Sequence, residues 1–165
     1  NCRQQRRARD RLCREGARSL KCPPGLDGVK LLWALAGNET SFGKNNVPLH
    51  EQAYCYRGRY FTKEVATLTR KWGCMAHCSY GPWQTLLINA TMAHPEPDPI
   101  KMHLDPHYAM EATVAFLNKR IFESQRAVTL KDVGDSYNSG NFRDDIIPVA
   151  YIEKLIKNYD TPLGI

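Results

Sequence analysis

Short stretches of helical periodicity, separated by glycine and proline, set the fold class of this chain. No segment alternates apolar and polar residues with a period of two, as a half-buried strand would. Asp27 and Thr129 stand where helix N-caps are expected, and Asp105-Pro106 is a cap followed by proline at the first helical position. Helices are predicted at about 28–43, 62–72, 84–92, 105–121, 129–140 and 145–158. We therefore expect a mainly α fold of several short helices with little β structure.

The charge of the chain is concentrated at its N-terminus. Residues 1–22 hold eight cations and two anions, a net charge of +6 that equals the net charge of all 165 residues. Five arginines fall three and four positions apart, on one face of a helix: Arg3, Arg7, Arg11, Arg14 and Arg18. Such a face suits an anionic envelope polymer, and the plain alternative is a solvated surface. The arm has no aromatic residues between its cations and no DNA-binding motif, so we expect no nucleic-acid partner.

Six cysteines raise the question of redox state. They are Cys2, Cys13, Cys22, Cys55, Cys74 and Cys78. An even number in a chain of this size predicts disulfide bonds and an oxidising, secreted or periplasmic location. Full pairing would need at least one bridge between the arm and the rest of the chain. The alternative is a zinc site at Cys55, Cys74, His77 and Cys78, but the paired two-residue spacing of common zinc modules is missing, so we expect neither metal nor cofactor.

A breaker cluster divides the chain. Residues 22–28, Cys-Pro-Pro-Gly-Leu-Asp-Gly, separate a basic arm at 1–22 from a body at 23–165. Residues 45–78 are irregular and carry three of the cysteines. The longest uncharged apolar run, 31–37, is too short to span a membrane.

Glu39 is the candidate catalytic residue. It lies near the C-terminal end of the most apolar predicted helix, close in sequence to Trp33 and Phe42. Apolar neighbours disfavour the ionised carboxylate and raise its pKa, which suits a general acid near neutral pH. A surface glutamate on an amphipathic helix is the alternative interpretation.

The segment Glu39-Thr-Ser-Phe-Gly43 resembles the Glu-Ser-Ser-Phe-Gly signature of the soluble lytic transglycosylase and goose-type lysozyme superfamily. Four further segments resemble family motifs in the same order: 80–84 (Tyr-Gly-Pro-Trp-Gln), 104–117 (beginning Leu-Asp-Pro), 135–140 (Asp-Ser-Tyr-Asn-Ser-Gly) and 147–152 (Ile-Pro-Val-Ala-Tyr-Ile). The resemblance implies a lysozyme-like fold for 23–165, with an insertion at about 45–78.

The resemblance also implies a function. The expected reaction is cleavage of the β-1,4 bond between N-acetylmuramic acid and N-acetylglucosamine in peptidoglycan, with Glu39 as the single general acid and base. Proton abstraction from the substrate's own hydroxyl would make a lytic transglycosylase, and activation of water would make a lysozyme. A water-positioning carboxylate would come from Glu51, Glu64 or Asp98. The residues implied to bind substrate are Ser41, Gly81, Trp83, Gln84, Tyr137 and Asn138.

Two other functions stay open. The altered Gly81-Pro-Trp-Gln84 segment is compatible with a non-catalytic module that binds peptidoglycan or a chitin-like glycan. Trp83 itself can stack on a sugar or fill the core. A nucleic-acid binder that uses the arm is the weaker alternative. For the enzyme we expect peptidoglycan strands as partner, a monomeric state and no membrane span.

Overall fold

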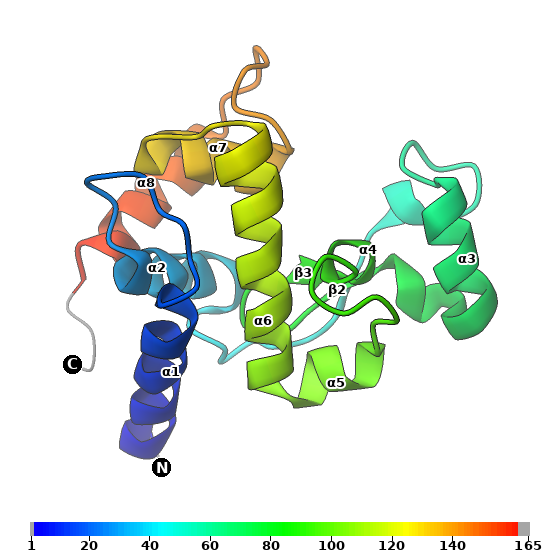
Figure 1. The fold of residues 1–165 in the computed structure, drawn as a ribbon, viewed down its shortest axis with the longest axis horizontal. Helices are drawn as coiled ribbons and strands as arrows, with labels where there is room; N and C mark the ends of the chain where they lie inside the picture. The colour runs from blue at the N-terminus through cyan, green and yellow to red at the C-terminus, as the bar shows by residue number, and fades with distance from the viewer. Residues whose placement is uncertain (1, 162–165) are drawn as a thin grey trace.

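A computed structural model describes residues 2–161, without the side chain of Cys2, and confirms the mainly α fold (Figure 1). The described helices are α1 (Cys2–Ala17), α2 (Gly28–Thr40), α3 (Lys63–Trp72), α4 (Leu87–Ala90), α5 (Pro99–Leu104), α6 (Pro106–Phe116), α7 (Leu130–Ser139) and α8 (Val149–Tyr159). Two 3-10 helices, η1 (Gln52–Tyr54) and η2 (Gly73–His77), and a π-helical turn, η3 (Leu117–Ser124), complete the helical structure.

A three-stranded antiparallel sheet is the only sheet in the described part of the chain. Its strands are β1 (Leu49–His50), β2 (Cys78–Tyr80) and β3 (Thr85–Leu86), in the order β1-β2-β3. His50 pairs with Cys78, and Tyr80 pairs with Thr85. The turn between β2 and β3 is Gly81–Gln84, one of the segments singled out in the sequence.

The predicted caps are confirmed. Asp27 accepts a hydrogen bond from the Lys30 backbone N–H at 3.0 Å, and Thr129 caps α7 by accepting from Asp132. Asp105 accepts from the second and third residues of α6. The expected helix at 84–92 is shorter, since β3 replaces its first turn. Helix α5 was not predicted; Pro99 suits its first position and Asp98 caps it.

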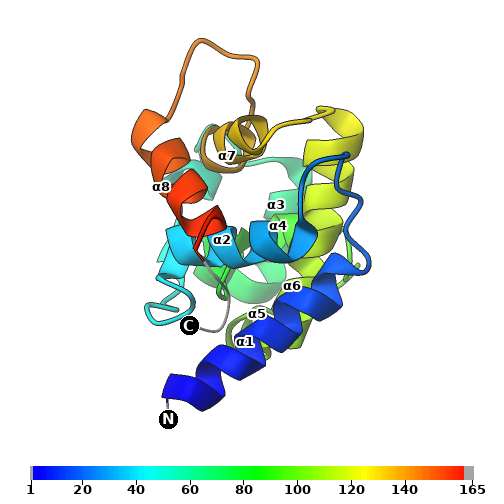
Figure 2. The same cartoon turned by 90° about the vertical axis from the view of Figure 1, so that its left-hand side faces the viewer.

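Helix α2 forms the centre of the larger of two cores. Seven consecutive residues of α2, from Leu31 to Gly37, are buried. Figure 2 shows α2 lying between α8 and α1. A second core lies under the sheet and α4, around Leu87 and Met102. Helix α6 contributes Met110 and Val114 to the first core and Ala109 and Ala112 to the second, so it joins the two lobes seen in Figure 1.

The predicted disulfide framework is wrong for the described cysteines. Cys13, Cys22, Cys55, Cys74 and Cys78 are all unpaired, and the Cys2 side chain lies outside the described residues. The physical reason is their position. Cys13 and Cys22 pack in the core around α2, whereas Cys78 packs in the other core. Burial also raises the pKa of Cys13 to about 12, which keeps its thiol protonated.

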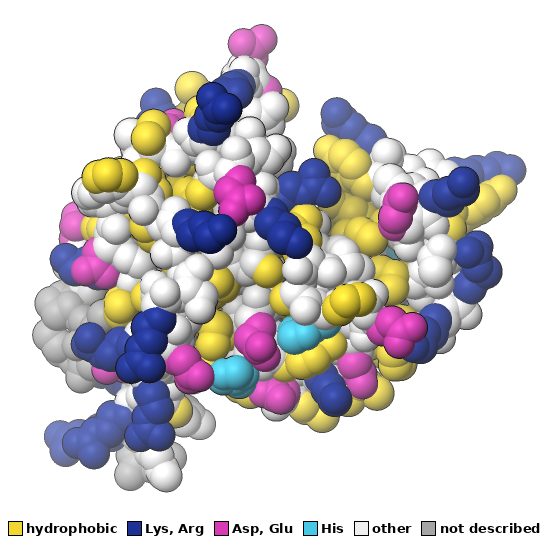
Figure 3. Space-filling model, in the orientation of Figure 1, with side chains coloured by type: hydrophobic (Ala, Val, Ile, Leu, Met, Phe, Trp, Pro, Cys, Tyr) yellow, Lys and Arg dark blue, Asp and Glu magenta, His cyan; other side chains and the backbone are white. Residues whose placement is uncertain are grey.

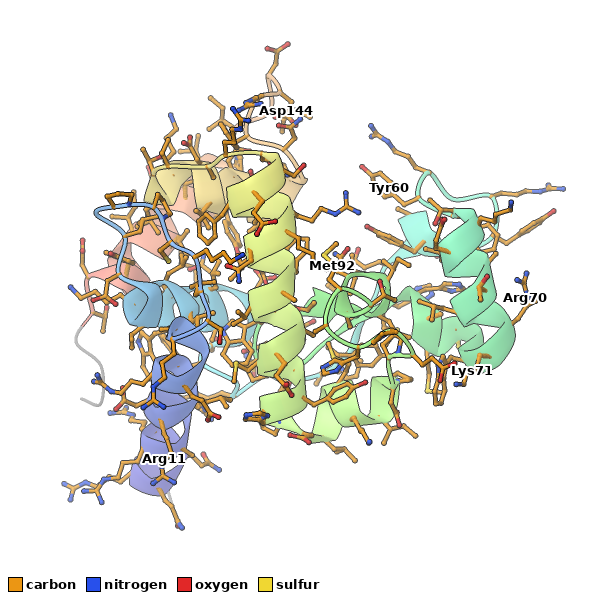
Figure 4. The ribbon with its side chains drawn as sticks, viewed as in Figure 1. Arg11, Tyr60, Arg70, Lys71, Met92 and Asp144 are labelled. Carbon is orange, nitrogen blue, oxygen red and sulfur yellow. The ribbon has the colours of Figure 1, made fainter. Side chains whose placement is uncertain are left out.

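Helix α1 is instead held by packing. A Cβ at Gly16 would lie 2.9 Å from the Met110 sulfur, so glycine permits the close approach of α1 to α6. Beside it, Glu15 accepts a hydrogen bond from His107 at 2.9 Å. Most arginines of α1 are exposed, and Figure 3 shows a cluster of basic side chains there, where Figure 4 labels Arg11; Arg9 is half-buried beside Gly43. In the described part of the chain, no helix is long and apolar enough to cross a membrane.

Gly37 provides a test of the packing around α2. A Cβ there would lie 2.6 Å from two ring carbons of Phe42 and 2.8 Å from the amide nitrogen of Asn158. We expect Gly37→Ala to lower the free energy of unfolding by about 1–3 kcal/mol, as overpacking does. The measurement is urea denaturation followed by circular dichroism.

The matched control is Gly28→Ala at the other end of the same helix. A Cβ there would meet its nearest neighbours at 3.3–3.5 Å, and alanine favours helix. This control should change stability by less than about 1 kcal/mol. Equal effects of the two substitutions would contradict the packing described for Phe42.

Candidate active site

Helix α2 ends abruptly just after Glu39. Ser41, Phe42 and Gly43 all have positive φ, at 50°, 62° and 80°. The Ser41 N–H donates to the Gly37 carbonyl and the Phe42 N–H to the Ala36 carbonyl, which closes the helix. Phe42 then folds back onto Trp33, with ring centroids 4.5 Å apart. The chain therefore turns sharply directly after α2, close to Glu39.

Glu39 is half-buried and carries a raised pKa. Burial is the main cause, and it raises the pKa of Glu39 to about 7 against an ordinary value near 4.5. The charge of Glu51 adds to the effect of burial, a hydrogen bond from Tyr151 and the charge of Lys154 oppose it, and about 7 is the net result. A carboxyl with this pKa is partly protonated at neutral pH and can act as an acid or a base.

Tyr151 of α8 donates a hydrogen bond from its hydroxyl to Glu39 Oε2 at 2.8 Å. Its backbone carbonyl accepts from the Asn38 side chain, which also accepts from Asn158. These bonds fix α8 against the end of α2. Tyr151 was not among the predicted site residues. Its signal in the sequence was its place in segment 147–152, which resembles the closing motif of the family.

The turn Gly81–Gln84 lies next to the end of α2. The Thr40 hydroxyl donates to the Pro82 carbonyl at 2.7 Å. Gly81 is buried with φ at 79°, and a Cβ there would lie 2.9 Å from that of Ala109. Gln84 also has a positive φ, and its side-chain amide donates to the Gly81 carbonyl at 3.0 Å. The turn is thus held by bonds to itself and to α2.

The remaining predicted residues divide into two groups. Tyr137 lies at the site: its hydroxyl donates to the Trp83 carbonyl at 2.5 Å, and burial and the charge of Glu39 raise its pKa. Trp83 is only 2% exposed and donates from its indole to the Leu32 carbonyl, so it is a core residue. Asn138 is exposed on α7, and Ser41 serves as the C-cap of α2.

The insertion forms the opposite wall. Figure 3 shows a notch between the body and the lobe that carries α3. The charge of Arg120 in η3 acts on Tyr54 in η1, so the two walls approach one another there. Of the three carboxylates considered from the sequence, Glu51 is the one whose charge acts on Glu39. Glu64 is exposed on α3, and Asp98 caps α5.

The insertion also brings together His50, Cys55 and His77, one ligand atom from each lying within 4.8 Å of the others. Cys55 and His77 are two of the four metal ligands considered from the sequence, and His50 is not among those four. The third residue of the group is His50, and neither Cys74 nor Cys78 belongs to it.

Comparison of the chain with protein-family models, curated proteins and solved structures gave no match. We therefore infer what this site does from its own geometry and from the order of the sequence motifs.

The raised pKa of Glu39 predicts a pH-dependent stability. In the unfolded chain Glu39 ionises near pH 4.5, and in the folded chain near pH 7, so the folded state binds more protons between these values and loses stability as pH rises through them. Glu39→Gln stays neutral at every pH, and its carbonyl still accepts from Tyr151.

We therefore expect Glu39→Gln to match the native chain in stability at pH 4 and to exceed it at pH 8, by up to about 3 kcal/mol. Urea denaturation at the two pH values measures this difference. A constant difference between pH 4 and pH 8 would show that the carboxyl titrates normally.

Proposed function

We propose that this chain cleaves the β-1,4 glycosidic bond between N-acetylmuramic acid and N-acetylglucosamine in peptidoglycan, on a lysozyme-like fold. The observation that carries the proposal is the half-buried Glu39 carboxyl, with a pKa of about 7 and a hydrogen bond from Tyr151. Motif order adds support, since Glu39, Gln84 and Tyr137 come from segments that resemble the family and that adjoin one another in the fold.

The proposed first step is proton transfer from the Glu39 carboxyl to the glycosidic oxygen, with departure of the leaving sugar as an alcohol. The positive charge that develops at the anomeric carbon is stabilised by the substrate's own acetamido group, a known route for glycosidases without a protein nucleophile. Glu39 is then a carboxylate, which the Tyr151 hydroxyl and Lys154 favour. It next takes a proton from the attacking hydroxyl, which restores the acid.

Glu51 supports water as the attacking group. Its charge raises the pKa of Glu39, and in this proposal it holds the attacking water molecule between the two walls. The product would then have a reducing end, as with a lysozyme. In this proposal the enzyme acts outside the cytoplasm, where its substrate lies, and the basic face of α1 binds an anionic envelope polymer.

A glycan-binding module without activity is the second candidate. The observation in its favour is that Trp83 is buried and that Gln84 is bonded within its own turn, so the segment 81–84 departs from the arrangement that the resemblance implies for the enzyme. Sugar binding without turnover would support it.

Replacing the acid tests the reaction directly. We expect Glu39→Gln to lower the rate of fragment release from purified peptidoglycan by about a hundredfold to ten-thousandfold, because the amide has no proton to transfer. Fragments are quantified by mass spectrometry. Glu64→Gln is the matched control, since Glu64 is exposed on α3, and it should keep the native rate. Native activity in Glu39→Gln would refute the mechanism, and no fragments from the native chain would favour the binding module.

Replacing Glu51 separates the two product types. If Glu51 holds the attacking water, Glu51→Gln should lower the release of reducing ends by about 10- to 100-fold through loss of orientation. The anhydro product, which needs no water, should not fall in parallel. The ratio of the two ends in the same digests gives the answer. Predominantly anhydro ends from the native chain would assign a lytic transglycosylase and leave Glu51 without a role in catalysis.

A further inference from the structure

Three side chains of types that commonly bind metals, two histidines and a cysteine, meet in the insertion, outside the site around Glu39. His50 is the last residue of β1, Cys55 directly follows η1, and His77 ends η2. Cys55 Sγ lies 3.2 Å from His50 Nε2 and 3.5 Å from His77 Nδ1. The sulfur thus faces one ring nitrogen from each histidine.

These separations suit a tetrahedral zinc ion. With Zn–S near 2.3 Å and Zn–N near 2.0 Å, a sulfur and a nitrogen ligand lie about 3.5 Å apart. Two imidazoles and one thiolate are also the donor set that Zn²⁺ prefers over Mg²⁺ or Ca²⁺. The two sulfur–nitrogen separations are therefore already close to those expected when zinc is bound.

Hydrogen bonds orient one of the three ligands. The Thr69 hydroxyl donates its single hydrogen to the Val65 carbonyl at 2.8 Å. Its oxygen lies 2.9 Å from His77 Nε2, so it accepts the hydrogen on that nitrogen. In the neutral ring, Nδ1 then has a free lone pair, and it is this atom that faces Cys55. Such an outer partner is the usual companion of a metal-binding histidine.

We propose that His50 Nε2, Cys55 Sγ and His77 Nδ1 bind one zinc ion, with its fourth position open to water. On binding, the Cys55 thiol releases its proton to solvent and becomes the thiolate ligand. Cys78 lies outside this set, with its sulfur directed at the Cys74 carbonyl at 3.6 Å. This proposal uses no residue of the Glu39 site and does not depend on the proposed activity.

The ion would fasten a part of the chain that has little regular structure. It would join β1, η1 and η2, which otherwise share a few backbone hydrogen bonds and an edge-on contact between the His50 and His77 rings. Glu51 follows His50 directly, and its N–H donates to the His77 carbonyl at 2.8 Å. Zinc would therefore also fix the wall of the cleft that carries Glu51.

The test uses the full chain without a histidine tag, stripped of metal with a chelator. Zinc is titrated in competition with a chromogenic chelator, and bound zinc is counted by elemental mass spectrometry. We expect one zinc per chain. Cobalt(II) in place of zinc should give a thiolate charge-transfer band and the intense d–d bands of a tetrahedral site. No bound zinc at stoichiometric concentration, or cobalt spectra without a thiolate band, would overturn the proposal.

Variants identify the ligands. Cys55→Ser, His50→Gln and His77→Gln should each weaken zinc binding by more than about 100-fold, and Thr69→Val by about 10- to 100-fold. Cys74→Ser is the matched control, because it removes an exposed thiol from the same lobe, and it should bind zinc like the native chain. Equal losses in Cys74→Ser and Cys55→Ser would refute the assignment.

A second measurement avoids variants that fail to fold. In the native chain, alkylation followed by peptide mapping reports the reactivity of each thiol. Zinc should protect Cys55 from alkylation and leave Cys74 reactive. Equal alkylation of Cys55 with and without zinc would overturn the proposal.

Discussion

The burial of the Glu39 carboxyl at the end of α2 is the interaction on which the rest of the site depends. Its two neighbours in sequence make bonds in opposite directions, Asn38 to α8 and Thr40 to the turn at Pro82. Because both neighbours are fixed, the backbone at Glu39 is held in place, and Tyr151 holds its carboxyl. The raised pKa is thus a consequence of how α2 is held.

This arrangement has a cost in stability. Each residue held in the left-handed region without being glycine costs about 1–3 kcal/mol, and Ser41 and Phe42 are both of this kind. The carboxyl itself is kept from its favoured ionised form. These costs are offset by burial along α2, where the run from Leu31 to Gly37 and Thr40 are buried. Strain that collects beside one titratable group is typical of a functional site.

Local features were predictable from the sequence, and long-range ones were not. Asp27, Asp105 and Thr129 mark helix starts because a cap depends on residues two or three positions away. The expected disulfide framework was wrong because an even count of cysteines says nothing about which core each cysteine joins. Tyr151 and His50 were not predicted because each meets a residue that is far away in the sequence. Tyr151 meets a residue 112 positions away, and His50 meets one 27 positions away that the structure places beside it.

The two walls of the site differ in how they are stabilised, and this decides what each contributes. The wall that carries Glu39 includes α2, which belongs to the large core, so the position and raised pKa of Glu39 follow from that packing. The wall that carries Glu51 consists of a two-residue strand, two 3-10 helices and α3, and its apolar support is the smaller core, where Leu68 packs with Ala76. Its position depends on polar contacts around His50, Cys55 and His77. In the proposed reaction, proton donation by Glu39 therefore depends on the packed core, whereas the choice of attacking group depends on what holds the insertion.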